Sequence, residues 1–324
     1  MNQNWKNFLL SQNAIFETAT QISFPDFSPA SDKSIYPLSH LAVLTISGKD
    51  AAKLLQGQTT CNINDITEEK SSLGAMCNPK GRAITTFLLV KTTDAFFMVL
   101  PYELLESVKK RLQMYILRSD VTLTDSSDAL CLIGLRQNDS QAEALFSTSQ
   151  QQAITVNFFH RSLIIAEPDQ TIALWSEQLA QGFQPENSQQ WRYLDILSGV
   201  PWLTTETSEQ FIPQMLNLDQ LGGISFSKGC YTGQEIVART HYLGKAKRAM
   251  FLAECNTPTP PEANSIIIDD STDPEQNMGN VLLAQNSQTI CKMLVVLQVS
   301  DTATYNLKLK DQNQAKLTLS AINS

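Results

Sequence analysis

Two apolar runs separated by only three residues constrain the fold of this chain more than any other feature of its sequence. The runs Ile84–Lys91 and Ala95–Leu100 are rich in β-branched and aromatic residues, and Thr92–Asp94 lies between them. Strands joined by so short a connection pair antiparallel, because a parallel pair needs a crossover of a dozen or more residues. The sequence therefore predicts a β-hairpin and argues against a doubly wound parallel sheet.

Helical patterns flank this hairpin and indicate a mixed fold. Val43–Ser47 alternates like a strand, and a helical stretch follows over Lys49–Leu55. Pro101 suits the first position of a helix whose apolar residues recur at helical spacing from Leu104 to Ile116. Two further strands and another helix are predicted at Val121–Thr124, Ala129–Leu135 and Ser188–Leu197. The predicted fold class is α+β.

After residue 249 the sequence changes character. Short strand-like runs alternate with turns rich in Pro, Asn and Asp, which is typical of an all-β module such as a small barrel. These runs are Ala249–Glu254, Val281–Ala284, Cys291–Val299, Leu307–Lys310 and Ala315–Leu319.

Charge and length exclude several classes of protein. The chain has 24 basic and 32 acidic residues and a net charge of -8, which argues against general nucleic-acid binding. Its longest apolar runs are too short to cross a bilayer, and its N-terminus lacks the pattern of a secretory signal, so we expect a cytoplasmic protein without a membrane partner. The six cysteines and three histidines do not have the spacing of a metal or cluster site, so no metal is predicted.

One basic window departs from the acidic average. Between Leu221 and Met250, Glu235 is the sole acidic residue beside five basic ones, Lys228, Arg239, Lys245, Lys247 and Arg248. A solvated helix face is the ordinary explanation for such a cluster. Its concentration in an acidic chain suggests an anionic ligand.

The stretch from Ser225 to Arg239 falls inside this window and predicts a helix. Thr232 and Glu235 have the spacing of a capping box, with Thr232 as the N-cap. Gly244 stands where a C-terminal glycine belongs.

Cys230 would lie just before the start of that helix, two residues after Lys228. The helix dipole and a nearby ammonium both favour a thiolate over a thiol. A lone cysteine is usually a small residue that fills a turn. The flanking Gly229 and Gly233, together with the lysine, favour a functional thiol here.

The run from Gly222 to Glu235 reads Gly-Gly-Ile-Ser-Phe-Ser-Lys-Gly-Cys-Tyr-Thr-Gly-Gln-Glu and closely resembles the signature of the YgfZ family of folate-binding proteins linked to tRNA modification. Supporting matches occur in order at Leu54–Thr60, Gly74–Arg82, Asn187–Trp191 and Gln210–Gln214. The resemblance extends over most of the chain and is weakest at residues 136–186 and beyond 255.

The resemblance implies a fold like that of the tetrahydrofolate-dependent T-protein of the glycine cleavage system, with three modules around a central opening and a β-barrel as the last. We expect α+β modules at 1–135 and 136–248, which can interleave in sequence, and the barrel at 249–324. The implied cofactor is tetrahydrofolate or another reduced folate. The implied role is the maintenance of iron–sulfur enzymes, with radical-SAM enzymes that modify tRNA as transient or indirect partners.

The resemblance also suggests site residues. The family's folate-contacting tryptophans correspond to Trp191, which matches, and Leu41, which does not. A tryptophan on a helix more often belongs to the core, but a pterin would stack well on an indole. The signature adds Lys228 and Cys230 as reactive residues. The signature and its matched motifs also suggest four folate contacts, Tyr231, Gln234, Arg248 and Gln58. Gln56, Asn78 and Arg82 are explained equally well as site residues or as residues that form hydrogen bonds within loops.

Three functions are compatible with these features. The first is a folate-binding accessory protein of iron–sulfur and tRNA-modification metabolism, with Cys230 as its reactive thiol. The second is a folate-dependent aminomethyl-type transferase. The argument against it is that Thr85 and Thr86 occupy the positions where T-proteins have an acidic pair, although Glu235 or Asp195 could supply a replacement carboxylate. The third is a non-catalytic docking protein whose basic 239–248 patch engages tRNA or an acidic protein.

Overall fold

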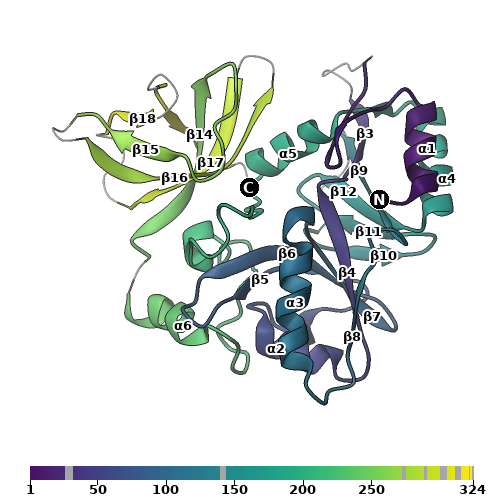
Figure 1. The fold of residues 1–324 in the computed structure, drawn as a ribbon, viewed down its shortest axis with the longest axis horizontal. Coiled ribbons are helices and arrows are strands. Elements are labelled where there is room, and N and C mark those ends of the chain that lie inside the picture. The colour runs from purple at the N-terminus through teal and green to yellow at the C-terminus, as the bar shows by residue number, and fades with distance from the viewer. Residues whose placement is uncertain are drawn as a thin grey trace. The chain divides into compact units, whose positions relative to one another are not determined.

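A computed structural model describes residues 1–25, 32–138, 144–244, 246–271, 275–287, 290–299, 305–310, 315–320 and 322. Contacts divide the chain into two compact units (Figure 1). Unit 1 comprises Met1–Leu55, Asn62–Ser72 and Phe87–Trp191, and unit 2 comprises Gln56–Cys61, Leu73–Thr86 and Arg192–Ser324. The two units therefore interleave in sequence, and the three-module boundaries given above stay a prediction. Lys245 of the basic window lies outside the described residues.

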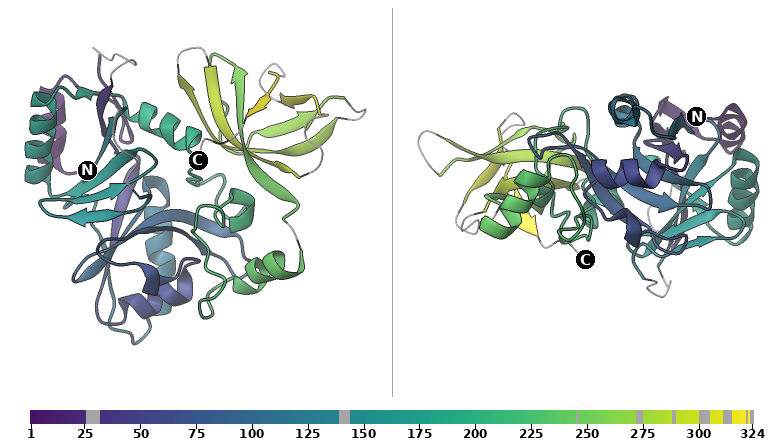
Figure 2. Two further views of the ribbon diagram at one scale, coloured as in Figure 1. Left: turned by 180° about the vertical axis from the view of Figure 1, so that it is seen from behind. Right: turned by 90° about the horizontal axis from the view of Figure 1, so that it is seen from below.

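Unit 1 contains a six-stranded sheet covered by two helices. Its strand order is β10-β11-β12-β9-β3-β13, antiparallel except for the pair of β13 with β3. The helices α1 (Gln3–Ser11) and α4 (Pro168–Ala180) lie side by side (Figures 1 and 2), and the rings of Trp5 and Trp175 meet edge-on at 5.4 Å. The strands are β3 (Lys33–Pro37), β9 (Cys131–Gln137), β10 (Thr148–Gln150), β11 (Ile154–Asn157), β12 (Arg161–Ala166) and β13 (Gln184–Pro185).

The predicted hairpin is confirmed. β6 (Ala83–Lys91) and β7 (Ala95–Pro101) pair antiparallel, and β7 pairs in turn with β4 (Leu41–Ser47). Residues 83–90 of β6 are all buried, including the polar Thr85 and Thr86, so both faces of this part of the strand are covered. The strand β6 begins in unit 2 and ends in unit 1. The smaller elements of unit 1 are β1 (Ile15–Thr18), β2 (Gln21–Ser23), η1 (Ile63–Asp65), η2 (Tyr102–Leu104), α3 (Leu105–Ile116) and β8 (Thr122–Asp125).

Unit 2 carries the C-terminal sheet, whose strand order is β18-β15-β16-β17-β14-β19. The sheet curls into a half-barrel (Figure 2), and the mixed α+β class is confirmed. Gly279 lets β16 approach β17, because a Cβ there would lie 2.0 Å from the carbonyl oxygen of Val296. The strands are β14 (Arg248–Asn256), β15 (Ile266–Asp269), β16 (Gln276–Ser287), β17 (Ile290–Gln298), β18 (Leu307–Leu309) and β19 (Thr318–Ser320).

Three further elements position the candidate site in unit 2: β5 (Ser72–Cys77), η3 (Pro213–Leu216) and α6 (Gln234–Leu243). The helices α2 (Ala51–Gln58) and α5 (Ser188–Leu197) each begin in unit 1 and end in unit 2. No helix in the described part of the chain is long and apolar enough to span a membrane.

Candidate functional site

Four of the five signature segments meet in unit 2. The ranges 74–82, 210–214 and 222–235 belong to this unit, as does all of Leu54–Thr60 except its first two residues, whereas Asn187–Trp191 belongs to unit 1. Segments distant in sequence thus build one local structure around the loop that leads into α6 (Figure 1).

Hydrogen bonds tie the Gly222–Glu235 segment to the end of α2. The Thr60 hydroxyl donates to the carbonyl of Gly223 at 2.6 Å, and the Ser225 amide donates to the carbonyl of Thr60 at 2.9 Å. Further along, the Thr232 amide donates to the carbonyl of Gly57 at 3.1 Å. These bonds hold both ends of the loop that contains Lys228 and Cys230.

Lys228 points into this structure rather than into solvent. Its side chain is 8% exposed, and Nζ donates to the carbonyl oxygens of Thr59 and Cys61, both at 2.7 Å. Burial lowers the pKa of Lys228 from 10.5 to about 8, because removal from water disfavours the charged amine. A neutral amine has two N–H donors, one for each of the two carbonyl oxygens. Its nitrogen also carries a lone pair that can accept a hydrogen bond.

The capping-box prediction is wrong. The N-cap of α6 is Gly233, which adopts a left-handed conformation with φ 85°, and no side chain caps this end. The Thr232 hydroxyl instead donates to Oε1 of Gln58 at 3.2 Å. Gly233 approaches another signature segment so closely that a Cβ would lie 2.6 Å from the carbonyl oxygen of Asn78. Contact with a distant segment thus decides where α6 begins. At the other end Gly244 is the C-cap, as predicted, and its backbone is extended.

Cys230 is the exposed member of the six cysteines; the other five are buried. It follows Gly229, where an added Cβ would meet no atom within 4 Å, so the loop is open at this point. The neighbouring Tyr231 is buried, its ring centroid is 5.1 Å from Lys228 Nζ, and burial raises its pKa. Gln234, the first residue of α6, is half-buried.

The segment 74–82 is held by hydrogen bonds to Glu209, which the sequence did not single out, and to Gln210, the first residue of a matched segment. The Asn78 side-chain amide donates to Oε2 of Glu209 at 2.6 Å, and the Arg82 guanidinium donates to the carbonyl of Gln210. Asn78 and Arg82 therefore act as loop-bonding residues, one of the two roles proposed for them. Glu209 has φ 61°, and no local sequence signal marks it.

Thr85 and Thr86, which the sequence comparison above sets against the acidic pair of T-proteins, are buried in β6. The Thr85 hydroxyl donates to the carbonyl of Thr86 at 2.9 Å, and that of Thr86 to the carbonyl of Pro201 at 2.6 Å. Of the two possible replacement carboxylates, Asp195 is buried and accepts from Nε1 of Trp202 at 2.9 Å. Glu235 is exposed.

Trp191 lies in the interior of unit 1. Its indole is fully buried, with the Arg161 guanidinium 4.3 Å from the ring centroid and the Tyr36 ring edge-on at 5.5 Å. The absence of a side chain on Gly134 makes room for it, since a Cβ would lie 2.3 Å from Cζ3. Within the described structure Nε1 of Trp191 finds no acceptor, and the same is true of Nε1 of the buried Trp175. Leu41, at the start of β4, is also buried.

An exposed aromatic and basic surface covers the end of α6. His241 stacks on Phe226 with ring centroids 3.6 Å apart, and Tyr242 meets His241 edge-on at 4.7 Å. Tyr242 and the adjacent Leu243 are 66% and 82% exposed. Arg239 and Lys247 are exposed as well, and Arg248 is half-buried at the start of β14; we call Phe226, Arg239, His241, Tyr242, Leu243 and Lys247 the α6 surface.

Comparison with known proteins identifies relatives of this chain. Residues 31–158 match the family model of the GCVT N-terminal domain. The chain is 35% identical over 262 residues to the tRNA-modifying protein YgfZ of Colwellia psychrerythraea, which covers 76% of this chain and 80% of the relative. The fold is similar to the crystal structure of the glycine cleavage system aminomethyltransferase T from Bartonella henselae, with a TM-score of 0.78, 12% identity and coverage of 99% of this chain and 97% of the other.

Proposed function

The chain belongs to the YgfZ family, and on that basis we propose that it is a folate-binding accessory protein that supports iron–sulfur enzymes and thereby tRNA modification, with Cys230 as its reactive thiol. The relative carries tRNA modification in its name, and the signature segments resemble those of its family. The partners would be iron–sulfur enzymes that modify tRNA, met transiently.

The observation that carries this proposal is an exposed thiol on a loop that other segments hold in place. Cys230 is exposed, while Lys228 and Thr232 on either side bond to residues 57–61. Such a loop presents a nucleophile without the need to fold on binding. A single thiolate cannot complete a four-coordinate site, so a cluster held here would need ligands from a partner.

A reduced folate would supply one-carbon units or reducing equivalents when bound. The buried N–H of Trp191 fits an acceptor of such a group, and Leu41 would add apolar contact. Because the indole is fully buried, with Arg161 over the ring and Tyr36 edge-on to it, a pterin would contact it only after these side chains move. Tyr231, Gln234, Gln58 and Arg248 remain the proposed further contacts, with the arginine suited to the anionic glutamate tail.

Folate binding is tested by titrating tetrahydrofolate into the protein and its Trp191→Phe variant. The substitution keeps an aromatic ring and removes the N–H, so affinity should fall about fivefold or more if the indole donates to folate. Trp175→Phe is the matched control, because Trp175 is equally buried in unit 1 and its Nε1 also has no acceptor in the described structure. Equal affinity in all three proteins would remove Trp191 from the site.

The role of Cys230 is tested in a deletion strain by measuring thiolated nucleosides in tRNA. Cys230→Ala should fail to restore them, whereas Cys255→Ala, which alters a buried thiol, should restore them. Full restoration by Cys230→Ala would refute a chemical role for this thiol.

The α6 surface favours a second candidate function, the docking of tRNA. Aromatic side chains provide stacking platforms for unpaired bases, and Arg239 and Lys247 can neutralise phosphates. Binding of tRNA should weaken in the double variant Arg239→Gln, Tyr242→Ala and fall steeply with salt. The control is Lys110→Gln, Tyr115→Ala, which removes an exposed lysine and a tyrosine from α3. Equal binding by both double variants would exclude this surface.

A further inference from the structure

Two cysteines of the C-terminal sheet lie directly opposite each other. Cys255 is the last residue but one of β14, Cys291 is the second residue of β17, and the antiparallel register pairs these two positions. Their side chains therefore point to the same face of the sheet, where both belong to the core of the half-barrel. The two thiols are within hydrogen-bonding reach of each other.

The neighbouring residues fix this register. Glu254 and Lys292 are also directly opposite each other, and they form an ion pair. A slip of one residue would turn the side chains of β17 to the other face and separate this pair. On the other side of the cysteines, Asn256 and Ile290 are the last pair of the ladder. The two thiols thus lie in a fixed register but close to the end of the ladder, where local opening is easiest.

Opposite positions of an antiparallel strand pair suit a disulfide. Their Cα atoms are about 4.5–5.5 Å apart, and so are their Cβ atoms. A disulfide needs a Cα separation of about 4.4–6.8 Å and a Cβ separation of about 3.5–4.5 Å. The bond therefore requires a small approach of the two side chains and no change of register.

Of the two thiols, Cys255 is the one suited to react first. The hydrogen bond with Cys291 lowers the pKa of Cys255, because it stabilises the thiolate. Cys291 is fully buried, whereas Cys255 is 5% exposed. A small oxidant can reach Cys255 when the end of the ladder opens, and the second thiol is then already in place.

We propose that Cys255 and Cys291 form a reversible disulfide in response to hydrogen peroxide. The Cys255 sulfur attacks one peroxide oxygen, the O–O bond breaks, and the leaving hydroxide takes the thiol proton and departs as water. The Cys291 sulfur then attacks the resulting sulfenic acid, so the S–S bond forms, the S–O bond breaks and a second water leaves. Two thiols are oxidised and one peroxide is reduced. A dithiol such as dithiothreitol returns the pair to the reduced form.

The disulfide would tie β14 to β17 across the part of the chain that contains β15 and β16. A cross-link that closes so long a loop stabilises the folded protein, chiefly because it restricts the unfolded chain. The pair therefore acts as a redox-controlled lock on the C-terminal sheet. It involves neither Cys230 nor folate, so failure of the proposed function leaves it standing.

The test is peroxide treatment of the full chain, followed by alkylation with N-ethylmaleimide in denaturant. The sequence has no Lys or Arg between Arg248 and Lys292, so trypsin leaves both cysteines on one peptide, 249–292. After oxidation this peptide should escape alkylation and be lighter than the reduced peptide by the mass of two hydrogens. A glutamate-specific protease should leave the fragments that contain Cys255 and Cys291 joined. Dithiothreitol should separate them and restore alkylation of both.

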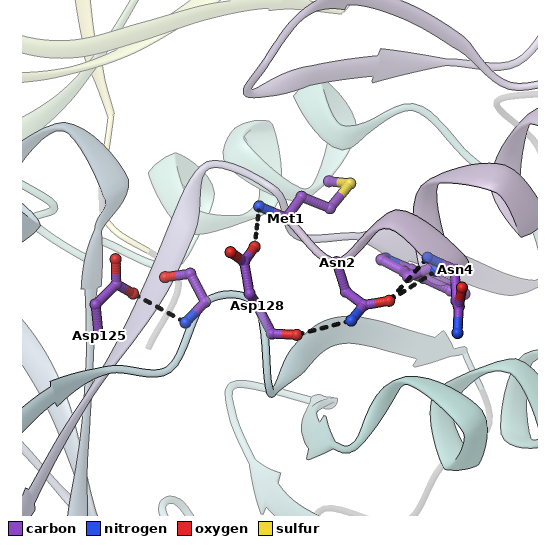
Figure 3. A network of polar contacts seen from close by, with 7 residues as sticks. Met1, Asn2, Asn4, Asp125 and Asp128 are labelled. Atoms are coloured by element: carbon purple, nitrogen blue, oxygen red, sulfur yellow. Dashed lines mark hydrogen bonds and ion pairs between the residues drawn. The ribbon is translucent and has the colours of Figure 1, made fainter.

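Cys131 of β9 is the control within the same sample. It is also buried, and burial raises its pKa to about 12, but the side chains that act on it are those of Thr171 and Asp128 rather than a second thiol. The turn before it is held by the Asn2 side chain, which donates to the carbonyl of Asp128 at 2.9 Å (Figure 3). Cys131 should therefore remain a thiol under the same treatment.

A thermal unfolding scan tests the lock itself. Peroxide should raise the midpoint of the unmodified protein by about 5 °C and leave that of Cys291→Ser unchanged. Three results would overturn the proposal: full alkylation of Cys255 and Cys291 after peroxide treatment, oxidation of Cys255 to a sulfinic acid without a bond to Cys291, and a disulfide from either cysteine to Cys230. All three are measured on the unmodified protein and do not require the variant to fold.

Discussion

At the scale of single residues, the exposure of Cys230 sets it apart from the other five cysteines. In the native protein iodoacetamide should modify Cys230 first, because a buried thiol must wait for an opening of the structure. Mass spectrometry of tryptic peptides measures the rate at each cysteine, and denatured protein gives the reference rates. If Cys61 or Cys255 is labelled as fast as Cys230 near neutral pH, the argument from exposure fails.

Lys228 should make stability depend on pH in a way that a surface lysine does not. Its pKa is about 8 in the folded protein and ordinarily 10.5, so between these values the unfolded state binds more protons. Stability therefore gains a contribution that rises with pH across this window. Urea unfolding over the window should show the rise in the unmodified protein and lose it in Lys228→Met.

Lys110→Met, which removes an exposed lysine, is the control and should keep the rise. A slope that is the same in Lys228→Met and in the unmodified protein would show that Lys228 stays charged when folded.

At the scale of elements, the glycine before α6 determines how the helix meets its neighbours. Gly233→Ala should destabilise the protein by about 1–2 kcal/mol for the left-handed backbone and by about 1–3 kcal/mol more for crowding against Asn78 and Gly81. Gly222→Ala is the matched control, since Gly222 has φ 72° in the same segment and open space around it. Chemical denaturation gives the free energy of unfolding of the two variants, and the difference between them is the contribution of crowding at Gly233.

Equal stability of the Gly233→Ala and Gly222→Ala proteins would mean that the close approach of α6 to the 78–81 turn is not required.

At the scale of the whole molecule, a T-protein-like fold does not by itself imply T-protein chemistry. The positions of the acidic pair hold Thr85 and Thr86, whose hydroxyls are buried and donate to backbone carbonyls. A hydroxyl does not ionise near neutral pH, and loss of a general acid–base group costs about 10² to 10⁴ in rate. We therefore expect almost no aminomethyl transfer from a loaded lipoyl carrier to tetrahydrofolate.

The control is a true T-protein assayed alongside. Comparable turnover would point to another carboxylate, and Asp195→Asn would then be the variant to assay, because Asp195 is buried in the same unit.

The amino-acid sequence alone determined the elements whose patterns are local and long. The hairpin of β6 and β7 and the helix α5 appear as predicted, α5 with the same bounds, because side-chain periodicity over about ten residues reports which face is buried. The four-residue strand β15 and the N-terminal helix α1 were not predicted. The signature segment also identified the family without any structure.

The tertiary structure alone decided what depends on contacts between distant segments. It shows Lys228 bonded to the carbonyls of Thr59 and Cys61, Gly233 rather than Thr232 as the N-cap, and Trp191 enclosed by Tyr36 and Arg161. Each outcome depends on residues from about 30 to 170 positions away in the chain. A local pattern records which side of an element is buried, but not which segment will bury it, and that choice is made by packing of the whole chain.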